Sequence, residues 1–270
     1  FSGWWAWTEE GKVNNLGDMI WIESRKAIRS RMPLWTAIGS MFVPLGIAFL
    51  IFVARNPQIS QKLGLISAKA DLVAYSATDW STYLTLFGQL MAAGGFFLFI
   101  LAISWTFGRE FADGTLKDLL AVPVQRANIL LAKFVVVAVW SAMLTLVILV
   151  VGLIMGVVIQ LPGGSPSIIL QGSDMILVTA GLALGVVIPF ALFASMGRGY
   201  LLPLGIAILT MMITNLIALM GWGEYFPWAV PGLYAQSTTL LPASLGLVIL
   251  TALAGMAGTY AWWMLADQSR

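Results

Sequence analysis

Six uncharged runs, each long enough to cross a lipid bilayer, constrain this chain more than any other feature of its sequence. A spanning helix needs about 20 apolar residues, because a residue adds about 1.5 Å and the hydrocarbon core is about 30 Å thick. With 60% hydrophobic and 10% charged residues, the chain has too little polar surface to cover a soluble globule. We therefore predict an all-α integral membrane protein with six transmembrane helices. The runs are residues 34–53, 81–108, 134–161, 175–197, 199–223 and 243–266.

Proline and glycine punctuate these runs. Pro44 lies in the first run and Pro189 in the fourth, and membrane helices tolerate proline where neighbouring helices satisfy the freed backbone groups. We expect kinks at both positions. Glycine also recurs at a spacing of four, which lets membrane helices approach closely. The pairs are Gly152 with Gly156 and Gly181 with Gly185.

The distribution of lysine and arginine predicts the orientation, because these residues gather on the cytoplasmic side of a membrane. One side of the predicted spans receives eleven of the 14 basic residues and the other receives three. Both termini are therefore predicted to be cytoplasmic, and residues 54–80, 162–174 and 224–242 to be external. The first group is Lys12, Arg25, Lys26, Arg29, Arg31, Arg109, Lys117, Arg126, Lys133, Arg198 and Arg270, and the second is Arg55, Lys62 and Lys69.

Several function classes are disfavoured. The chain contains neither cysteine nor histidine, so the commonest metal ligand, the commonest general base and the thiol nucleophile are missing, and we expect no metal site and no catalytic residue. No charged residue lies near the middle of a predicted span, which disfavours an ion-coupled carrier. The net charge of +2 reflects basic residues at span ends, so it does not indicate a nucleic-acid partner.

The N-terminal region divides at the first methionine, Met19. Residues 1–18 are an extension of uncertain origin, equally consistent with a tryptophan-rich interfacial anchor and with upstream sequence that has no role. Residues 19–270 are predicted to form a single six-span domain. Its first segment, MIWIESRKAIRSR, is typical of a helix lying on the cytoplasmic membrane surface with its basic face on anionic lipid headgroups, or simply of a basic flank of the first span. The residues assigned to this interfacial helix are Trp21, Arg25, Lys26, Arg29 and Arg31.

A compact charged segment separates the second and third runs. Thr115 followed three residues later by Asp118 matches the capping box at a helix start, and Pro123 ends the segment. Between them, three leucines share one helical face. The pattern predicts a short amphipathic helix in a cytoplasmic loop, where a plain solvated connection is the alternative.

This loop resembles the cytoplasmic loop of ABC-2 type transporter permeases. The matching residues are Glu110, Gly114, Thr115, Leu116, Leu119, Leu120, Pro123, Arg126 and Lys133. The layout from Met19 to Arg270 is similar to the family as well. The resemblance implies a coupling helix that docks on a cytoplasmic ATPase subunit, and a second permease copy, identical or different, that completes the path. The implied ATPase-coupling residues are Arg109, Glu110, Phe111, Asp113, Gly114, Thr115, Leu116, Lys117, Leu119, Leu120, Pro123 and Arg126.

No phosphate-binding loop of the G-x-x-x-x-G-K-[ST] type occurs in the sequence. The chain is therefore expected to bind no cofactor and to be no enzyme itself, with ATP and Mg²⁺ bound by partner ATPase subunits. The resemblance implies an exporter in the cytoplasmic membrane of a prokaryote. A non-transporting membrane anchor or sensory subunit is the alternative, and a membrane-embedded enzyme is disfavoured by the missing catalytic residues.

Two further sets of residues are candidates for the transport path. Residues 225–242 carry three prolines, which predicts a re-entrant or external interfacial hairpin in place of a continuous span. The residues assigned to this external segment are Trp228, Pro231 and Tyr234. This hairpin could seal the external mouth or serve as a passive aromatic anchor. Polar residues inside the spans could contact a hydrophobic or amphipathic cargo, such as a drug, peptide antibiotic or lipid, although such side chains often bond the neighbouring backbone instead. They are Gln89, Thr145, Thr179, Thr214 and Asn215.

Overall fold

The computed structural model describes residues 16–55, 79–114, 125–197, 199–237 and 240–265. Within these ranges the chain is helical and contains no strand. Six helical stretches are long and apolar enough to cross a membrane, which confirms the predicted all-α class and the number of spans. They are Met32–Val53, Trp80–Ala112, Arg126–Val158, Pro166–Met196, Leu201–Leu219 and Pro242–Leu265.

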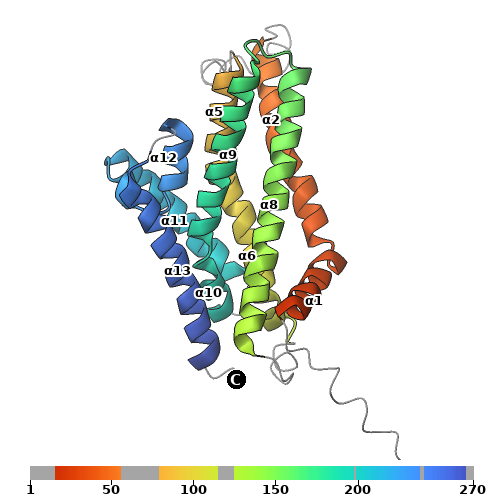
Figure 1. Cartoon of the computed structure of the whole chain (residues 1–270), viewed down its shortest axis with the longest axis vertical. Helices are drawn as coiled ribbons and strands as arrows, with labels where there is room; N and C mark the ends of the chain where they lie inside the picture. Colours follow the sequence, from red (N-terminus) through yellow and green to blue (C-terminus); the bar gives the residue numbers. More distant parts are fainter. Residues whose placement is uncertain (1–15, 56–78, 115–124, 198, 238–239, 266–270) are drawn as a thin grey trace, which may run out of the picture.

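The bundle has two sides (Figure 1). On one side stand α2 (Met32–Arg55), α8 (Arg126–Val158), the span formed by α5 (Trp80–Leu90) and α6 (Phe96–Ala112), and α9 (Pro166–Val187). The other side consists of α11 (Leu201–Leu219), α12 (Val230–Ser237) and α13 (Pro242–Leu265), with α10 (Phe190–Met196) below them. Helix α1 (Leu16–Arg29) packs against the lower part of α8. We call this lower end of the bundle, where α6 ends and α8 begins, the α1 end.

Two spans begin earlier than their uncharged runs. The third was predicted to start at residue 134, but α8 begins at Arg126 and carries Lys133 two turns inside the helix. The fourth was predicted from residue 175, but α9 begins at Pro166, where the Ser165 hydroxyl accepts a hydrogen bond from Ile168 N at 3.3 Å. Both predicted boundaries were wrong because a charged residue ended the run without ending the helix.

The second span is not a uniform α-helix. A π-helical turn, η1 (Met91–Gly95), separates α5 from α6, and its sequence MAAGG has two adjacent glycines that allow the backbone to depart from α-geometry. At the start of α5, the Asp79 carboxylate caps the helix by accepting a hydrogen bond from Thr82 N at 2.8 Å. That hydrogen bond lowers the pKa of Asp79.

The two prolines behave differently. Helix α2 continues through Pro44 as one helix, whereas the fourth span breaks at Pro189 between α9 and α10, as predicted for that position. Gly255 of α13 packs directly on this break, since a Cβ atom there would lie 2.6 Å from Pro189 N. The break between α9 and α10 is thus the surface on which α13 packs.

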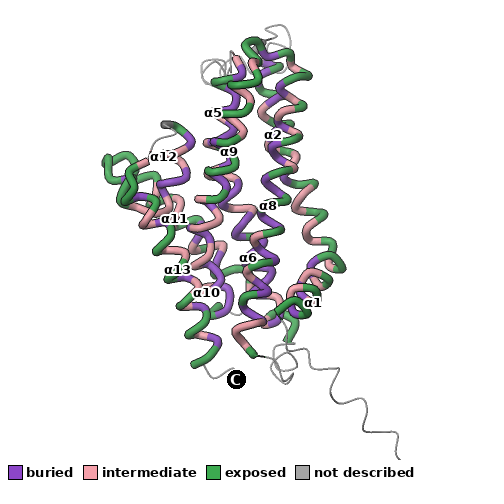
Figure 2. Tube along the Cα trace, in the orientation of Figure 1, coloured by how far each residue is buried: buried purple, intermediate pink, exposed green. Residues whose placement is uncertain are grey.

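Close helix contacts form the core (Figure 2). A Cβ atom on Gly156 would lie 2.5 Å from the Trp80 ring, and the Tyr83 hydroxyl donates a hydrogen bond to Gly152 O at 2.8 Å. The predicted close approach at these two glycines is therefore confirmed between α8 and α5. In the other pair, a Cβ atom on Gly185 would meet Val248 of α13, while Gly181 has no such neighbour within 4 Å.

Candidate functional site

Four charged side chains from three helices meet at the α1 end of the bundle. Glu23 and Lys26 come from α1, Glu110 from the last turns of α6, and Lys133 from α8. Lys133 is fully buried, while Glu23 and Glu110 are 4% and 6% exposed. We call these four residues the charge cluster.

The ammonium group of Lys133 is the centre of the cluster. Its Nζ donates to Glu110 Oε1 at 2.8 Å, to Glu23 Oε2 at 3.2 Å and to the Thr106 carbonyl at 3.0 Å. Lys26 Nζ lies 2.7 Å from Glu23 Oε1 and 3.1 Å from Glu110 Oε1. Each acid therefore contacts both lysines, and the cluster is neutral.

Helical spacing explains how the charges come together. Met19, Glu23 and Ala27 follow one another at intervals of four and are the buried face of α1, which packs on α8. On α6, Thr106 and Glu110 are also four residues apart, so the carbonyl and the carboxylate both face Lys133. An isolated buried charge would be strongly unfavourable, and the paired arrangement offsets that penalty.

The pKa values of the two α1 residues reflect this pairing. Burial alone would raise the pKa of Glu23, but the positive charges of Lys133 and Lys26 outweigh burial and lower it. For Lys26, burial alone would lower the pKa, but the negative charges of Glu23 and Glu110 raise it. Both side chains are thus held in their charged forms.

The structure divides the predicted interfacial residues between two faces of α1. Lys26 turns inward to the charge cluster and does not belong to an outward basic face. Arg25, Arg29 and Arg31 are exposed, and the Arg25 guanidinium lies 4.3 Å from the centre of the ring of Trp21, itself 57% exposed. The helix is therefore two-faced, with the remaining predicted residues directed away from the bundle.

The predicted coupling residues are described only in part. Thr115, Leu116, Lys117, Leu119, Leu120 and Pro123 lie outside the described residues, and so does the predicted short helix. Glu110 is enclosed within the chain, whereas Arg109 pairs with Asp113 at 3.1 Å on the exposed side of α6. Gly114, the last described residue before the loop, has a positive φ of 69°, a backbone conformation that glycine adopts easily.

Contacts to α13 fix both edges of the loop between α6 and α8. Arg126 Nη1 donates to the carbonyl of Trp263 at 2.7 Å, and the Phe111 ring packs edge-on against the Trp263 ring with centres 6.1 Å apart. Trp263 is fully buried, and its indole N–H donates to the Ser195 hydroxyl at 3.0 Å. The two ends of the loop are therefore anchored to the same residue, one through its backbone carbonyl and the other through its ring.

Three predicted path residues line one cavity. Gln89, Thr214 and Asn215 border a space of about 170 Å³ between α5, η1, α11 and α12, together with Trp228 and Gln236. The Thr214 hydroxyl and the Asn215 amide also donate hydrogen bonds to backbone carbonyl groups four residues earlier. These two side chains therefore also bond the neighbouring backbone, which was the alternative to a contact with cargo.

The other two predicted path residues lie elsewhere. Thr145 lines a separate, largely apolar cavity of about 250 Å³ beside Ser141. Thr179 is fully buried and donates to Met175 O at 2.7 Å. The structure therefore brings three of the five residues together and leaves two apart.

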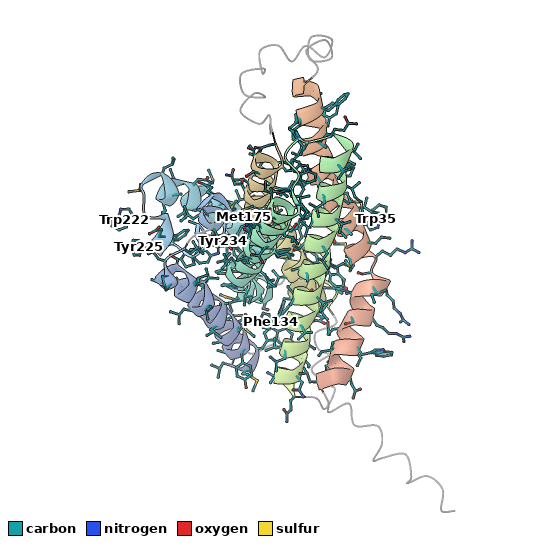
Figure 3. All side chains as sticks on the ribbon, turned by 45° about the horizontal axis from the view of Figure 1, so that its top comes forward. Trp35, Phe134, Met175, Trp222, Tyr225 and Tyr234 are labelled. Carbon is teal, nitrogen blue, oxygen red and sulfur yellow. The ribbon has the colours of Figure 1, made fainter. Side chains whose placement is uncertain are left out.

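The segment after α11 is broken, as its prolines predict. A short 3-10 turn, η2 (Gly223–Tyr225), leads to α12, which packs on α9 and α5 before the chain turns into α13. The Trp228 indole donates to Val186 O at 2.9 Å, a carbonyl in the last turn of α9 that has no partner within its own helix. Pro231 is buried and Tyr234 partly buried, and Figure 3 shows Tyr234 on the bundle side near Met175.

Four residues of these regions were not predicted from the sequence. Glu23 and Lys133 were not recognised as partners, although a helix extended back to Arg126 would have placed Lys133 opposite Glu110. Trp222 and Tyr225 were not singled out, yet they are 68% and 67% exposed at the far end of α11 and point away from the bundle (Figure 3). Their position at the end of an apolar run is typical of membrane-interface aromatics.

Comparison with known proteins places this arrangement in a family. The sequence model of the ABC-2 family transporter proteins matches residues 19–215, a range that includes most of α1, the loop edges and the entire charge cluster. The chain belongs to the ABC-2 transporter family. This ABC-2 protein is also similar to the bacitracin transport permease protein BCRB of Bacillus licheniformis, with 28% identity over 141 residues, which are 52% of this chain and 68% of that protein. The predicted family is therefore confirmed, and the chain is a multi-pass member of a transporter family.

Proposed function

We propose that this ABC-2 protein is the membrane subunit of an ATP-driven exporter, coupled to separate ATPase subunits through the loop between α6 and α8. The observation that carries the proposal is the continuity of the second span. It borders the polar cavity at Gln89 and ends at the loop edge at Asp113. A push on the loop would therefore reach the cavity through one helical stretch.

The ATPase function is assigned to partner chains. The sequence has no phosphate-binding loop, and the described residues contain no group of acidic side chains, histidines or cysteines suited to hold a metal ion. ATP and Mg²⁺ would bind to the partners, and their closure around ATP would move the loop. Asp113 and Gly114 are exposed and Arg109 is partly exposed, so these described residues are available for that contact.

Pairing of two permease copies is supported by α11. Only 11% of its spanning window is buried within the chain, against 44% for α8 and 50% for α9 with α10. Asn215 is exposed on this helix, and an amide facing hydrocarbon is unfavourable. A second copy covering this side of α11 would shelter the amide and enclose the cavity.

The proposed orientation places the α1 end in the cytoplasm of a prokaryote. The basic residues favour that side by eleven to three, and α13 ends at the same end of the bundle as α1 (Figure 1). Exposed Arg25, Arg29 and Arg31 would then meet anionic headgroups, each contributing about 1 kcal/mol near the surface. On the opposite side, η2 and α12 would form the external re-entrant hairpin.

The cargo is proposed to be hydrophobic or amphipathic, and a peptide antibiotic is the best-supported class. The cavity combines amide and hydroxyl groups with apolar walls, and the similar Bacillus protein is named for bacitracin transport. Proteoliposomes that contain this protein with its co-purified ATPase test the proposal. ATP-dependent movement of bacitracin across the bilayer is expected, and stable ATPase binding without movement of bacitracin or other amphipathic peptides would indicate a membrane anchor instead.

A further inference from the structure

The charge cluster connects the two edges of the coupling loop to α1, a helix that is distant from the loop in the sequence. Glu110 lies three residues before Asp113, and Lys133 lies seven residues after Arg126, so the cluster is within about two helical turns of both loop edges. Helix α1 precedes both by more than one complete span. Its ion pairs with Glu110 and Lys133 are therefore a direct connection between α1 and the two loop-bearing helices.

We propose that the charge cluster is a mechanical joint in which Lys133 and Glu110 make α1 move together with the loop-bearing ends of α6 and α8. This inference rests on the proposed coupling of the loop to an ATPase. It gives the force a second route, from α1 into α2, in addition to the route along the second span. Glu110 and Lys133 are then positioning residues that act through α1 and make no contact with the ATPase.

The bonding pattern distinguishes this joint from an ordinary apolar helix contact. Lys133 donates to acceptors on both α1 and α6 from its own position on α8, which fixes the three helices in one register. Apolar side chains of similar volume often replace a buried ion pair without loss of stability, because desolvation offsets much of the electrostatic attraction. Fixing the register is therefore the better explanation for placing four charges here.

The connection from α1 to α2 is short and closely bonded. The Ser30 hydroxyl donates to Ala27 O at 2.6 Å and accepts from Met32 N at 3.2 Å, so one side chain ties the end of α1 to the start of α2. Arg31 between them has a φ of 58°, a left-handed conformation that restricts the turn. A rotation of α1 would therefore also move the start of α2, because the connection between the two helices is short and hydrogen-bonded.

The decisive variant is Glu23→Gln with Lys26→Gln, which detaches the α1 charges and leaves the Glu110 and Lys133 pair intact. Net charge is unchanged, so folding and ATPase co-purification should persist. In proteoliposomes with the ATPase, the bacitracin moved per ATP hydrolysed is expected to fall at least about tenfold. Ser244→Ala, which removes the hydrogen bond from a buried hydroxyl of α13 to the Glu224 carbonyl at the opposite end of the bundle, is the matched control and should leave the ratio unchanged.

A distance measurement supplies a readout that a loss of stability alone would not mimic. Because the chain has no cysteine, paired spin labels can be placed at exposed Ile28 of α1 and exposed Val139 of α8 by substitution with cysteine. With the natural cluster, the distance should be narrowly distributed and should not change when ATP is added, because α1 and α8 move together. In the double variant the distance should broaden and should change when ATP is added, because α1 no longer follows α8.

The outcomes separate the joint from the proposed function. If the unmodified complex moves no bacitracin or other amphipathic peptide with ATP, the proposed export function fails. If it moves the peptide and the folded double variant moves as much per ATP, the joint is refuted. If the double variant does not fold, Glu23→Leu with Lys26→Met replaces the same charges by apolar groups, and normal coupling in that variant would equally refute the joint.

Discussion

The ammonium group of Lys133 lies inside the bundle, and its neutral surroundings depend on the acids of two other helices. Replacing Lys133 with a neutral residue removes one of the four charges and leaves an excess of negative charge in the buried charge cluster. The residue therefore affects stability most when it is changed alone, and less when an acid is removed with it.

Lys133→Met should destabilise the folded protein by about 3–5 kcal/mol, because Glu23 and Glu110 would then share only Lys26. Adding Glu110→Gln should restore a large part of the loss by returning the cluster to neutrality. Detergent-dependent unfolding of the purified protein, followed by tryptophan fluorescence, measures both values. Equal losses for the single and the double variant would show that charge balance does not matter at this site.

The docking of α1 should depend on pH only at its extremes. Because the folded pKa of Glu23 is lowered, the stabilisation is present above the ordinary glutamate value of about 4.3 and is lost as pH falls through the lower folded value. The raised pKa of Lys26 preserves its contribution below about 10.4, and it is lost only as pH rises through the higher folded value. The mobility of a spin label at Ile28→Cys should therefore stay constant from pH 5 to pH 9, roughly the range between these values, and an increase near neutrality would contradict this account.

At the scale of helices, the sequence predicted which segments span the membrane but not all their boundaries. Apolar length is a local property, so all six spans and the break at Pro189 were recognised. The start of α8 was missed because Lys133 was counted as a terminus, when three-dimensional pairing allows that charge to lie within a helix. The η1 turn could not be predicted from MAAGG alone, since neighbouring packing decides whether adjacent glycines leave α-geometry.

The crossing of α13 over the proline break provides a test of helix packing. Gly255→Ala would place a methyl group 2.6 Å from the backbone nitrogen of Pro189, which cannot move aside, so we expect a loss of about 1–3 kcal/mol. Gly246→Ala in the same helix meets nothing within 4 Å and should be neutral or slightly stabilising, since alanine favours helix. Thermal unfolding of the two variants in the same detergent measures the difference, and similar values would argue against this crossing.

At the scale of the whole molecule, resemblance of the loop predicted the family, whereas the candidate path residues were chosen only because they are polar and lie inside the predicted spans. Gln89, Thr214 and Asn215 could be chosen as polar residues in apolar runs, but their meeting in one cavity depends on how α11 and α12 pack beside α5. Thr145 and Thr179 look the same in sequence and lie elsewhere. Tertiary packing, which a single sequence does not display, separates the two groups.

The proposed pairing through α11 can be checked by crosslinking in membranes. Leu216→Cys on α11 and Val139→Cys on α8 are similarly exposed, at 61% and 64%, and each would be the only cysteine in the chain. Oxidation should join two copies through position 216 and not through position 139. Crosslinking at 139 alone would move the contact between copies to α8, and crosslinking at neither would argue against a closely packed pair.

The unequal lengths of the helices have a consequence for the shape of an assembled pair. With 33 residues α8 measures about 50 Å, whereas α11 with 19 residues measures about 28 Å and its far end lies lower than those of α8 and α9 (Figure 1). If two copies meet through α11, their shortest spans stand at the centre, and α8, which lies on the opposite side of each copy, stands toward the edge. The outer face would then be a shallow basin, and a peptide leaving it would still be surrounded by protein walls at the depth of the lipid headgroups.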